Sequence, residues 1–128
     1  HTIVDLGDDV FTVGRPHPMI DPSTRTDRLD KEAEDPSVAV LLLDLVLGFG
    51  SHPDPAGALA PHLEAARAKA AARGGRLSVV ASVTGTPSDF QGFEDQRRKL
   101  EAAGAVVLPS NRPAARLAAR ILQKGASR

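Results

Sequence analysis

The chain has no cysteine, tryptophan or tyrosine, and it has four phenylalanines. Without cysteine it can form no disulfide, no thiolate metal site and no cysteine nucleophile. Because it has few aromatic rings, the chain has few side chains on which nucleic-acid bases could stack. No apolar run approaches the length that spans a bilayer, and no secretory signal is visible. These absences favour a cytoplasmic protein that binds neither nucleic acid nor membrane.

A length of 128 residues corresponds to one domain with room for a hydrophobic core. The sequence contains no internal repeat, low-complexity tract or interdomain linker. It begins with histidine and not with methionine. We therefore expect residues 1–128 to be a single domain, cut from the carboxyl-terminal part of a longer protein.

The formal net charge is zero, but the charges are unevenly divided. Residues 1–54 carry eleven acids and four bases, whereas residues 55–128 carry five acids and twelve bases. On a helix, basic residues at every fourth position form a stripe. Such a stripe can be a solvated face that complements the helix dipole, or a contact for an acidic partner domain or a phosphorylated ligand. The stripe consists of Arg112, Arg116, Arg120, Lys124 and Arg128.

Residues 38–47 are apolar at nine of ten positions and show no alternation with polar residues. This pattern is typical of a strand buried on both faces in a parallel sheet covered by helices. We expect Val38–Val46 to be the central strand, with Asp44 as its only acidic residue. Leu42→Asp should then unfold the domain, because an unpaired buried charge is costly.

The remaining elements alternate between strands and helices. Asp21-Pro22 and Asp54-Pro55 are helix start signals, and Ser88 with Gln91 forms a capping box. Alternation with short connections predicts right-handed crossovers. We expect an α/β fold, a flavodoxin-like three-layer sandwich with a mostly parallel sheet of four or five strands. Further strands are expected at Ile3–Leu6, Leu77–Val83 and Ala105–Leu108. Helices are expected from Pro22 to about Glu34, from Pro55 to Gly74-Gly75, from Ser88 to Gly104, and after Ser110-Asn111, the last with an apolar face of Ala114, Leu117, Ala118, Ile121 and Leu122.

Ligands of open parallel sheets bind at the carboxyl ends of the strands. Three loops should meet there, Gly48–Asp54, Thr84–Asp89 and Ser110–Arg112, and Gly7–Asp9 joins them if Ile3–Leu6 is a parallel strand. Each of the three leads into a helix N-terminus, where free backbone amides favour an anion. The loops match neither the Walker motif nor the dinucleotide fingerprint.

The segment from Gly14 to Asp21 reads Gly-Arg-Pro-His-Pro-Met-Ile-Asp. Its two prolines fix an extended path and hold Arg15 and His17 in a set relation. Arg15 could grip a carboxylate or phosphate, and His17 could donate a proton, accept one or be phosphorylated. The alternative is a rigid packing loop in which Arg15 pairs with Asp5 or Asp21.

Histidine and acidic side chains could also converge near this segment. His52 lies in the glycine-rich loop, where a functional role is plausible. His17, His52, Asp8 and Asp54 do not follow a metal-ligand spacing, so no metal site is predicted.

The stretch Asp35–Gly50, followed later by Gly85-Thr86, resembles the carboxy-terminal ligase domain of the succinyl-CoA synthetase β subunit. That family has a strand after Asp-Pro-x-Val that ends in Asn-Ile-Phe-Gly-Gly-Ile-Val, and a later strand that ends in Gly-Thr-Asn. His1–Asp9 falls where the family has a leucine-aspartate-glycine-rich loop. Within the superfamily, Gly14–Asp21 is most similar to the FdrA proteins, acyl-CoA synthetase homologues linked to purine-nitrogen breakdown and oxamate carbamoyl transfer.

The resemblance implies a substrate-binding role for Gly48, Phe49, Gly50, Ser51, Gly85 and Thr86. The family's strand-end asparagine falls on Asp44, and one glycine of its pair is Leu47 here. Arg15, His17 and Asp44 are the candidate catalytic side chains. The phosphohistidine motif, the CoA-binding Rossmann domain and the ATP-grasp fold of the superfamily are absent from this sequence.

The resemblance thus implies an enzyme part that supplies one wall of an acyl- or carbamoyl-transfer site. The rest would come from CoA-binding and phosphohistidine-type domains of the same protein or operon, with a homodimer also possible. The fragment alone should bind no cofactor and be silent, whereas the longer protein could use CoA and a nucleotide. The alternative is a non-catalytic scaffold module, in which Arg15, His17 and Asp44 are engaged in internal pairs.

Overall fold

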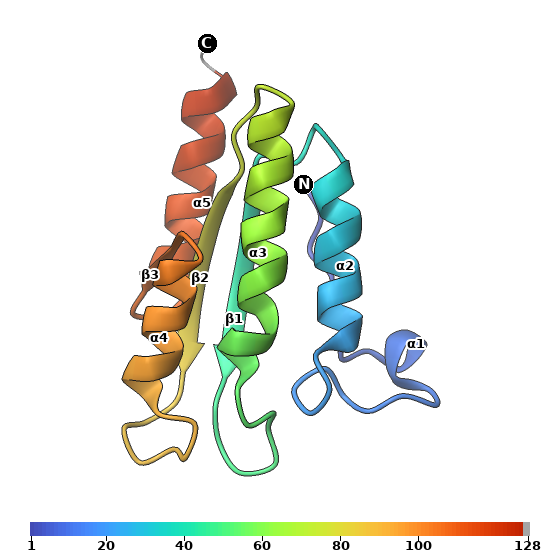
Figure 1. Cartoon of the computed structure of the whole chain (residues 1–128), viewed down its shortest axis with the longest axis vertical. Helices are drawn as coiled ribbons and strands as arrows, with labels where there is room; N and C mark the ends of the chain where they lie inside the picture. Colours follow the sequence, from blue (N-terminus) through green and yellow to red (C-terminus); the bar gives the residue numbers. More distant parts are fainter. Residues whose placement is uncertain (127–128) are drawn as a thin grey trace.

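The computed structural model describes residues 1–126. Three parallel strands form one sheet in the order β1-β2-β3, and helices precede, connect and follow them (Figure 1). The elements in chain order are α1 (Asp9–Thr12), α2 (Ser23–Glu34), β1 (Val40–Val46), α3 (Pro55–Ala72), β2 (Ser78–Thr84), α4 (Phe93–Ala102), β3 (Ala105–Leu108) and α5 (Asn111–Ala126). The α/β class and the parallel sheet are confirmed.

The sheet of the described residues has three strands, so the expected four or five is wrong. Ile3–Leu6 forms no strand, and the side chain of Ile3 is fully exposed. Asp5 accounts for this locally, because its carboxylate accepts the Gly7 N–H at 2.9 Å and its carbonyl accepts the Asp8 N–H at 3.3 Å. Such local hydrogen bonds favour a turn over a ladder. Residues from Asp9 onward then form the short helix α1.

The main core lies on one face of the sheet. Leu41, Leu45, Val79 and other residues at odd positions of the strands pack there against α2, α3 and α4, and Leu59 and Leu63 of α3 are buried among them. The opposite face is covered by α5, which contacts all three strands. Helices therefore lie on both faces, as expected for a flavodoxin-like fold.

The two faces of β1 are unequally buried, contrary to the prediction of burial on both. Leu45 is fully buried on the α3 side, whereas Leu42, on the α5 side, is 47% exposed. In the order β1-β2-β3, β1 is an edge strand, so its prediction as the central strand is wrong. A single helix covers the α5 face, and it leaves the outer part of β1 open. The premise of the expected unfolding by Leu42→Asp, a fully buried side chain, is therefore wrong, because water reaches that position.

Both Asp-Pro pairs lie at helix starts, but only Asp54 is an N-cap. It caps α3 by accepting the Gly57 N–H at 3.0 Å. The N-cap of α2 is Pro22, one residue later than predicted, and Asp21 precedes it and accepts the Ser23 N–H at 2.9 Å. The predicted capping box is wrong: α4 begins at Phe93 after Gly92, which has a φ of 75°. The Gln91 side chain is instead buried, as described below.

The predicted apolar face of the last helix is confirmed. Ala114 and Ala118 of α5 are buried, and the larger apolar side chains Leu117, Ile121 and Leu122 are partly buried. Arg128, the last member of the basic stripe, lies outside the described residues. Among the described helices, none combines the length and apolarity that crossing a bilayer requires.

Candidate functional site

The carboxyl ends of β1 and β2 bring two predicted loops together. Val46 is in register with Thr84, and the Leu47 N–H donates to the Thr84 carbonyl at 2.8 Å. A Cβ at Gly85 would lie 2.9 Å from the Leu47 Cβ, so glycine permits this close approach. The two loops emerge at the same end of the sheet (Figure 1). The predicted convergence of the Gly48 and Gly85 loops is thus observed.

Gln91 joins the two loops. Its side chain is 6% exposed. Its Oε1 accepts the Gly48 N–H at 3.2 Å, and its Nε2 donates to the carbonyls of Gly48 at 2.9 Å and His52 at 3.3 Å. One side-chain amide therefore holds both polar groups of the Gly48 residue and fixes how the glycine-rich loop leaves β1.

Gln96 continues this network toward α3 and is 1% exposed. Its Oε1 accepts the Ala56 N–H at 2.8 Å, while its Nε2 donates to Asp54 Oδ1 at 2.9 Å and to the Gln91 carbonyl at 3.3 Å. Sequence reasoning missed both glutamines. For Gln96, the available signal was a polar residue on the inward side of α4. Gln91 was missed because it was interpreted as part of a capping box.

Asp54 is the charged member of the network. Lys99 Nζ of α4 donates to its Oδ1 at 3.0 Å, in addition to the bonds from Gly57 and Gln96. Burial raises the pKa of Asp54, but these hydrogen bonds and the Lys99 charge outweigh it and hold the pKa below the ordinary value of 3.8. The Asp54 carboxylate thus already accepts an N–H of the first turn of α3. A ligand anion would have to approach the outer part of the loop, at Phe49 and Gly50, because the Gly48 and Ser51 N–H groups are already bonded within the chain.

This pKa direction predicts acid sensitivity. A carboxyl whose pKa is depressed by folding stabilises the folded state above its unfolded-state pKa, and this contribution is lost as pH falls through the folded-state pKa. Urea unfolding at several pH values should therefore show Asp54→Asn less stable than the unaltered chain near neutral pH. The two stabilities should converge as the pH falls from 3.8 through the lowered folded-state pKa of Asp54. A difference that stays constant as the pH falls through this acidic range would contradict the assignment.

The outer part of the glycine-rich loop projects its backbone outward. Gly48 and Gly50 have φ values of 135° and 86°, a region that disfavours other residues. Phe49 between them is fully exposed. An exposed aromatic ring flanked by two glycines places apolar surface and open backbone at the same point of the loop.

In the second loop, Thr84–Asp89, a carboxylate of the loop itself occupies the hydrogen-bond donors of Thr86. Asp89 Oδ2 accepts the Thr86 N–H at 2.6 Å and the Thr86 hydroxyl at 3.2 Å. A Cβ at Gly48 would lie 3.9 Å from Asp89 Oδ1, so this carboxylate faces the first loop. The Thr86 amide, predicted to bind a ligand, is therefore already bonded to Asp89, which any competing anion would have to displace.

The proline-containing segment lies along the glycine-rich loop. The His52 N–H donates to the Met19 carbonyl at 2.7 Å. His17 is held within the segment, because its Nδ1 accepts the Met19 N–H at 3.2 Å. Its Nε2 covers Gly7, where a Cβ would meet it at 2.6 Å. The segment with His17 is thus anchored to the same end of the sheet as the two loops.

Arg15 is exposed, and no ion pair among the described residues includes it. Pairing with Asp5 or Asp21 is therefore not observed. The pKa of Asp21 is lowered mainly by hydrogen bonds from Ser23, with smaller contributions from the charges of His52 and Arg15. The Arg15 guanidinium is thus exposed and outside the ion pairs of the described residues, on the segment that Met19 joins to His52. In the part of the chain that the structure describes, no three His, Asp or Glu side chains are placed to hold a metal ion.

Asp44 and Ser110 are not drawn into this cluster. Asp44 is 54% exposed on the α5 side of β1, where its carboxylate lies 3.9 Å from Arg25 of α2. Arg25 also donates to the Asp44 carbonyl at 2.5 Å, and burial lowers the pKa of this arginine against the opposing charge of Asp44. After Ser110, α5 begins with Asn111, whose Oδ1 accepts the Ser82 hydroxyl inside the sheet.

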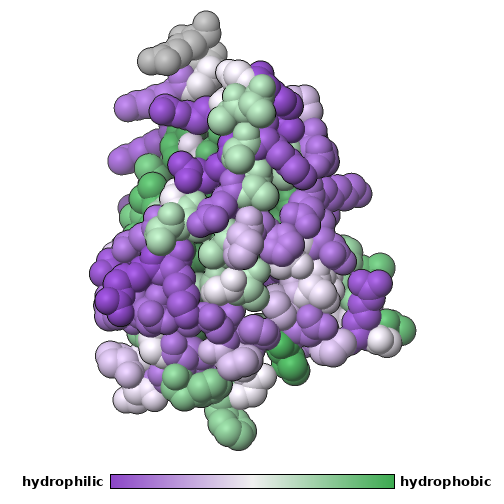
Figure 2. All heavy atoms as spheres, in the orientation of Figure 1, coloured by the Kyte–Doolittle hydropathy of each residue, from purple (hydrophilic) through white to green (hydrophobic). Residues whose placement is uncertain are grey.

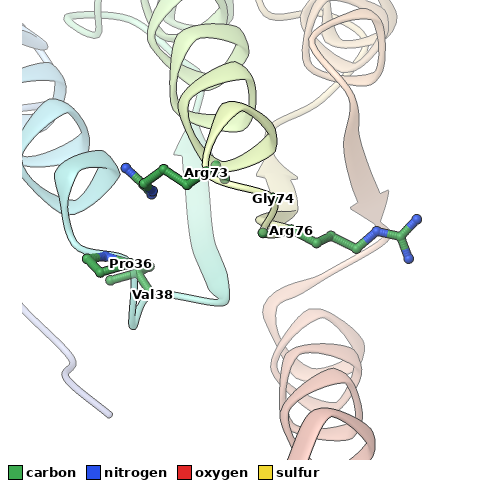
Figure 3. A pocket seen from close by; sticks show the side chains of 7 residues that line it. Pro36, Val38, Arg73, Gly74 and Arg76 are labelled. Carbon is green, nitrogen blue, oxygen red and sulfur yellow. The ribbon is translucent and has the colours of Figure 1, made fainter.

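The amino-terminal edge of the sheet has a small cavity of about 180 Å³, remote from these loops. Arg73 and Arg76 border it (Figure 3). Arg73 donates to the Ala33 carbonyl at 2.9 Å, and Arg76 points away from the cavity (Figure 3). The cavity therefore offers no cluster of free polar groups, and the carboxyl edge is the better candidate site. The cavity is lined by Pro36, Val38, Ala70, Arg73, Gly74, Gly75 and Arg76.

Comparison with known proteins agrees with this topology. Residues 1–121 match the CoA-ligase family. The chain belongs to this family. It is also 47% identical over 125 residues to the uncharacterized protein YahF of Escherichia coli (strain K12). That alignment covers 98% of this chain but 24% of YahF, so the CoA-ligase domain spans about a quarter of this relative's length.

Proposed function

We propose that this CoA-ligase domain supplies one wall of an acyl- or carbamoyl-transfer site in a longer acyl-CoA synthetase-like protein of the FdrA type. The remaining walls would come from CoA-binding and phosphohistidine-type domains of the same protein or operon. CoA and a nucleotide would be bound by those domains, and we expect the isolated domain to show no turnover.

The supporting observation is the juxtaposition at the carboxyl edge. The Gly48–Ser51 backbone and the Thr86–Asp89 turn lie side by side, and the His52–Met19 hydrogen bond adds the segment of Arg15 and His17. The Gly48, Ser51 and Thr86 amides are bonded within the chain, so the amides of Phe49 and Gly50 are the ones open to a ligand. Backbone amides and a guanidinium can bind a carboxylate, a phosphate or a developing oxyanion.

The site's incompleteness favours a shared site over an independent one. Phe49 is fully exposed at the loop tip, as an aromatic residue at an interface would be before its partner docks. Within residues 1–126, no three His, Asp or Glu side chains gather to hold a metal ion. The arrangement suits binding and positioning of a group that another domain transfers.

A scaffold role without chemistry is the alternative. It is favoured by the engagement of Asp44 with Arg25 and of His17 with the Met19 N–H, and also by that of Asp89 with Thr86. Arg15 does not follow this pattern, because it forms no ion pair among the described residues. The two roles therefore differ most in what Arg15 and its neighbour His17 contribute.

Arg15→Ala and His17→Ala in the full-length protein test the proposal. Each should lower turnover by about tenfold or more, because each removes a positioned charge or hydrogen-bonding group. Both side chains are exposed, so the thermal unfolding midpoint should change little. Turnover and melting are measured on the same preparations.

Lys31→Ala is the matched control, because Lys31 is exposed, basic and without an ion pair among the described residues, but lies on α2 away from the loops. It should leave both turnover and melting unchanged. If Arg15→Ala and His17→Ala instead melt much earlier and keep full activity per folded molecule, the segment is structural and the scaffold role is favoured.

A further inference from the structure

Helix α5 carries a basic surface that its own residues do not neutralise. It has no acidic residue. Its described cations are exposed and belong to none of the ion pairs within residues 1–126. On α4, by contrast, Arg97 pairs with Glu94 and Glu101. The unpaired cations of α5 are Arg112, Arg116, Arg120 and Lys124.

The sheet beneath α5 is also incompletely covered. Leu42, Val80 and Val106 are in register across the three strands. Val80 is fully buried under α5, but Leu42 is 47% and Val106 is 52% exposed on either side of it. Exposed apolar side chains beside unpaired cations suit a protein partner better than a small anion, since only a protein covers both.

The opposite side of the molecule has complementary features. Asp8 and Asp9 at α1 are exposed and unpaired among the described residues, and Val10 and Val13 beside them are 77% and 82% exposed. Figure 1 shows α5 and α1 on opposite flanks of the sheet. Figure 2 shows apolar and strongly polar side chains together where α1 projects, and polar side chains projecting along α5.

We propose that the α5 face of one molecule docks on the α1 surface of a second copy of this chain. The α5 face comprises the four cations with Leu42 and Val106, and the α1 surface comprises Asp8, Asp9, Val10 and Val13. The charges of the two surfaces are opposite in sign, with four cations on the α5 face and two carboxylates on the α1 surface.

The geometry of this contact follows from the placement of the two surfaces. Pairing α5 with α5 would oppose like charges, so contact between different surfaces is favoured. A contact between unlike surfaces on opposite flanks is head-to-tail. It generates a ring if the rotation closes and an open chain if it does not. A net charge of zero further reduces the repulsion between copies.

Sedimentation velocity at two salt concentrations tests the proposal. At about 50 mM salt the chain should form species larger than a monomer as its concentration rises, and at about 500 mM these should dissociate, because salt screens exposed charges. Arg116→Glu with Arg120→Glu should stay monomeric at both concentrations and melt like the unaltered chain. A monomeric unaltered chain at low salt, or a variant that associates like it, overturns the proposal.

A charge swap identifies the partner surface. Asp9→Lys with Val10→Lys makes the α1 surface basic without removing a side-chain hydrogen bond, and alone it should stay monomeric. Combined in one chain with Arg116→Glu and Arg120→Glu, it should restore association at low salt, and failure to restore it overturns the assignment to α1. None of these residues belongs to the Gly48–Asp54 or Thr86–Asp89 loops, so the outcome is independent of the proposed transfer site.

Discussion

Leu45→Asp is expected to abolish folding of this domain. The side chain of Leu45 on β1 is fully buried in the main core, on the α3 side of the sheet. An aspartate there would place an unpaired charge in the main core, or would have to bind a proton to avoid it, at a cost of about 5 kcal/mol or more. This is comparable with the whole stability of a small domain. Circular dichroism should show loss of the cooperative thermal transition.

Leu42→Asp, three residues earlier on the same strand, is the matched control. Its side chain is 47% exposed on the α5 side of the sheet. The same chemical change should therefore cost only about 1 kcal/mol, and the variant should still unfold cooperatively. Equal loss of structure in the two variants would contradict the assignment of faces to β1.

Gln96→Leu is expected to have the second largest effect. The leucine has a similar volume but no polar groups, so the buried N–H of Ala56 loses its acceptor and Asp54 loses a donor. Buried polar groups without partners cost about 1 to 3 kcal/mol each, and a total of about 3 kcal/mol is expected. Urea unfolding measures this as a lower transition midpoint with an unchanged slope.

Arg98→Leu serves as the control for Gln96→Leu, because it introduces the same residue on the exposed side of α4. It should lower stability by about 0.5 kcal/mol or less. A Gln96→Leu variant as stable as this control would mean that the glutamine network does not hold the loop in solution.

The fold was largely predictable from the sequence. The continuous apolar run of residues 38–47 correctly located β1, and the Asp-Pro pairs located the starts of α2 and α3. The exposure of Leu42 was not predictable, because burial of the second face depends on how many helices cover it. The missing strand at Ile3–Leu6 is explained by the local turn that Asp5 forms.

The candidate site was predictable only as a set of loops. The strand-end rule brought Gly48 and Gly85 together, because it follows from parallel topology alone. Gln91 was missed because its partner Gly48 lies 43 residues away in the chain. A sequence shows that a glutamine is present, but its buried partner is defined only once α4 is docked beside the loop.

The measurement that tests the proposed function most directly is an amide NMR titration. The labelled domain is titrated with the CoA-binding part of the longer protein, supplied as a separate chain. Amides of Gly48–Ser51 and Thr86 should shift strongly, while those of Arg73–Arg76 at the opposite edge of the sheet should not. Shifts confined to the opposite edge, or none at high titrant concentration, would contradict a shared site at the carboxyl edge.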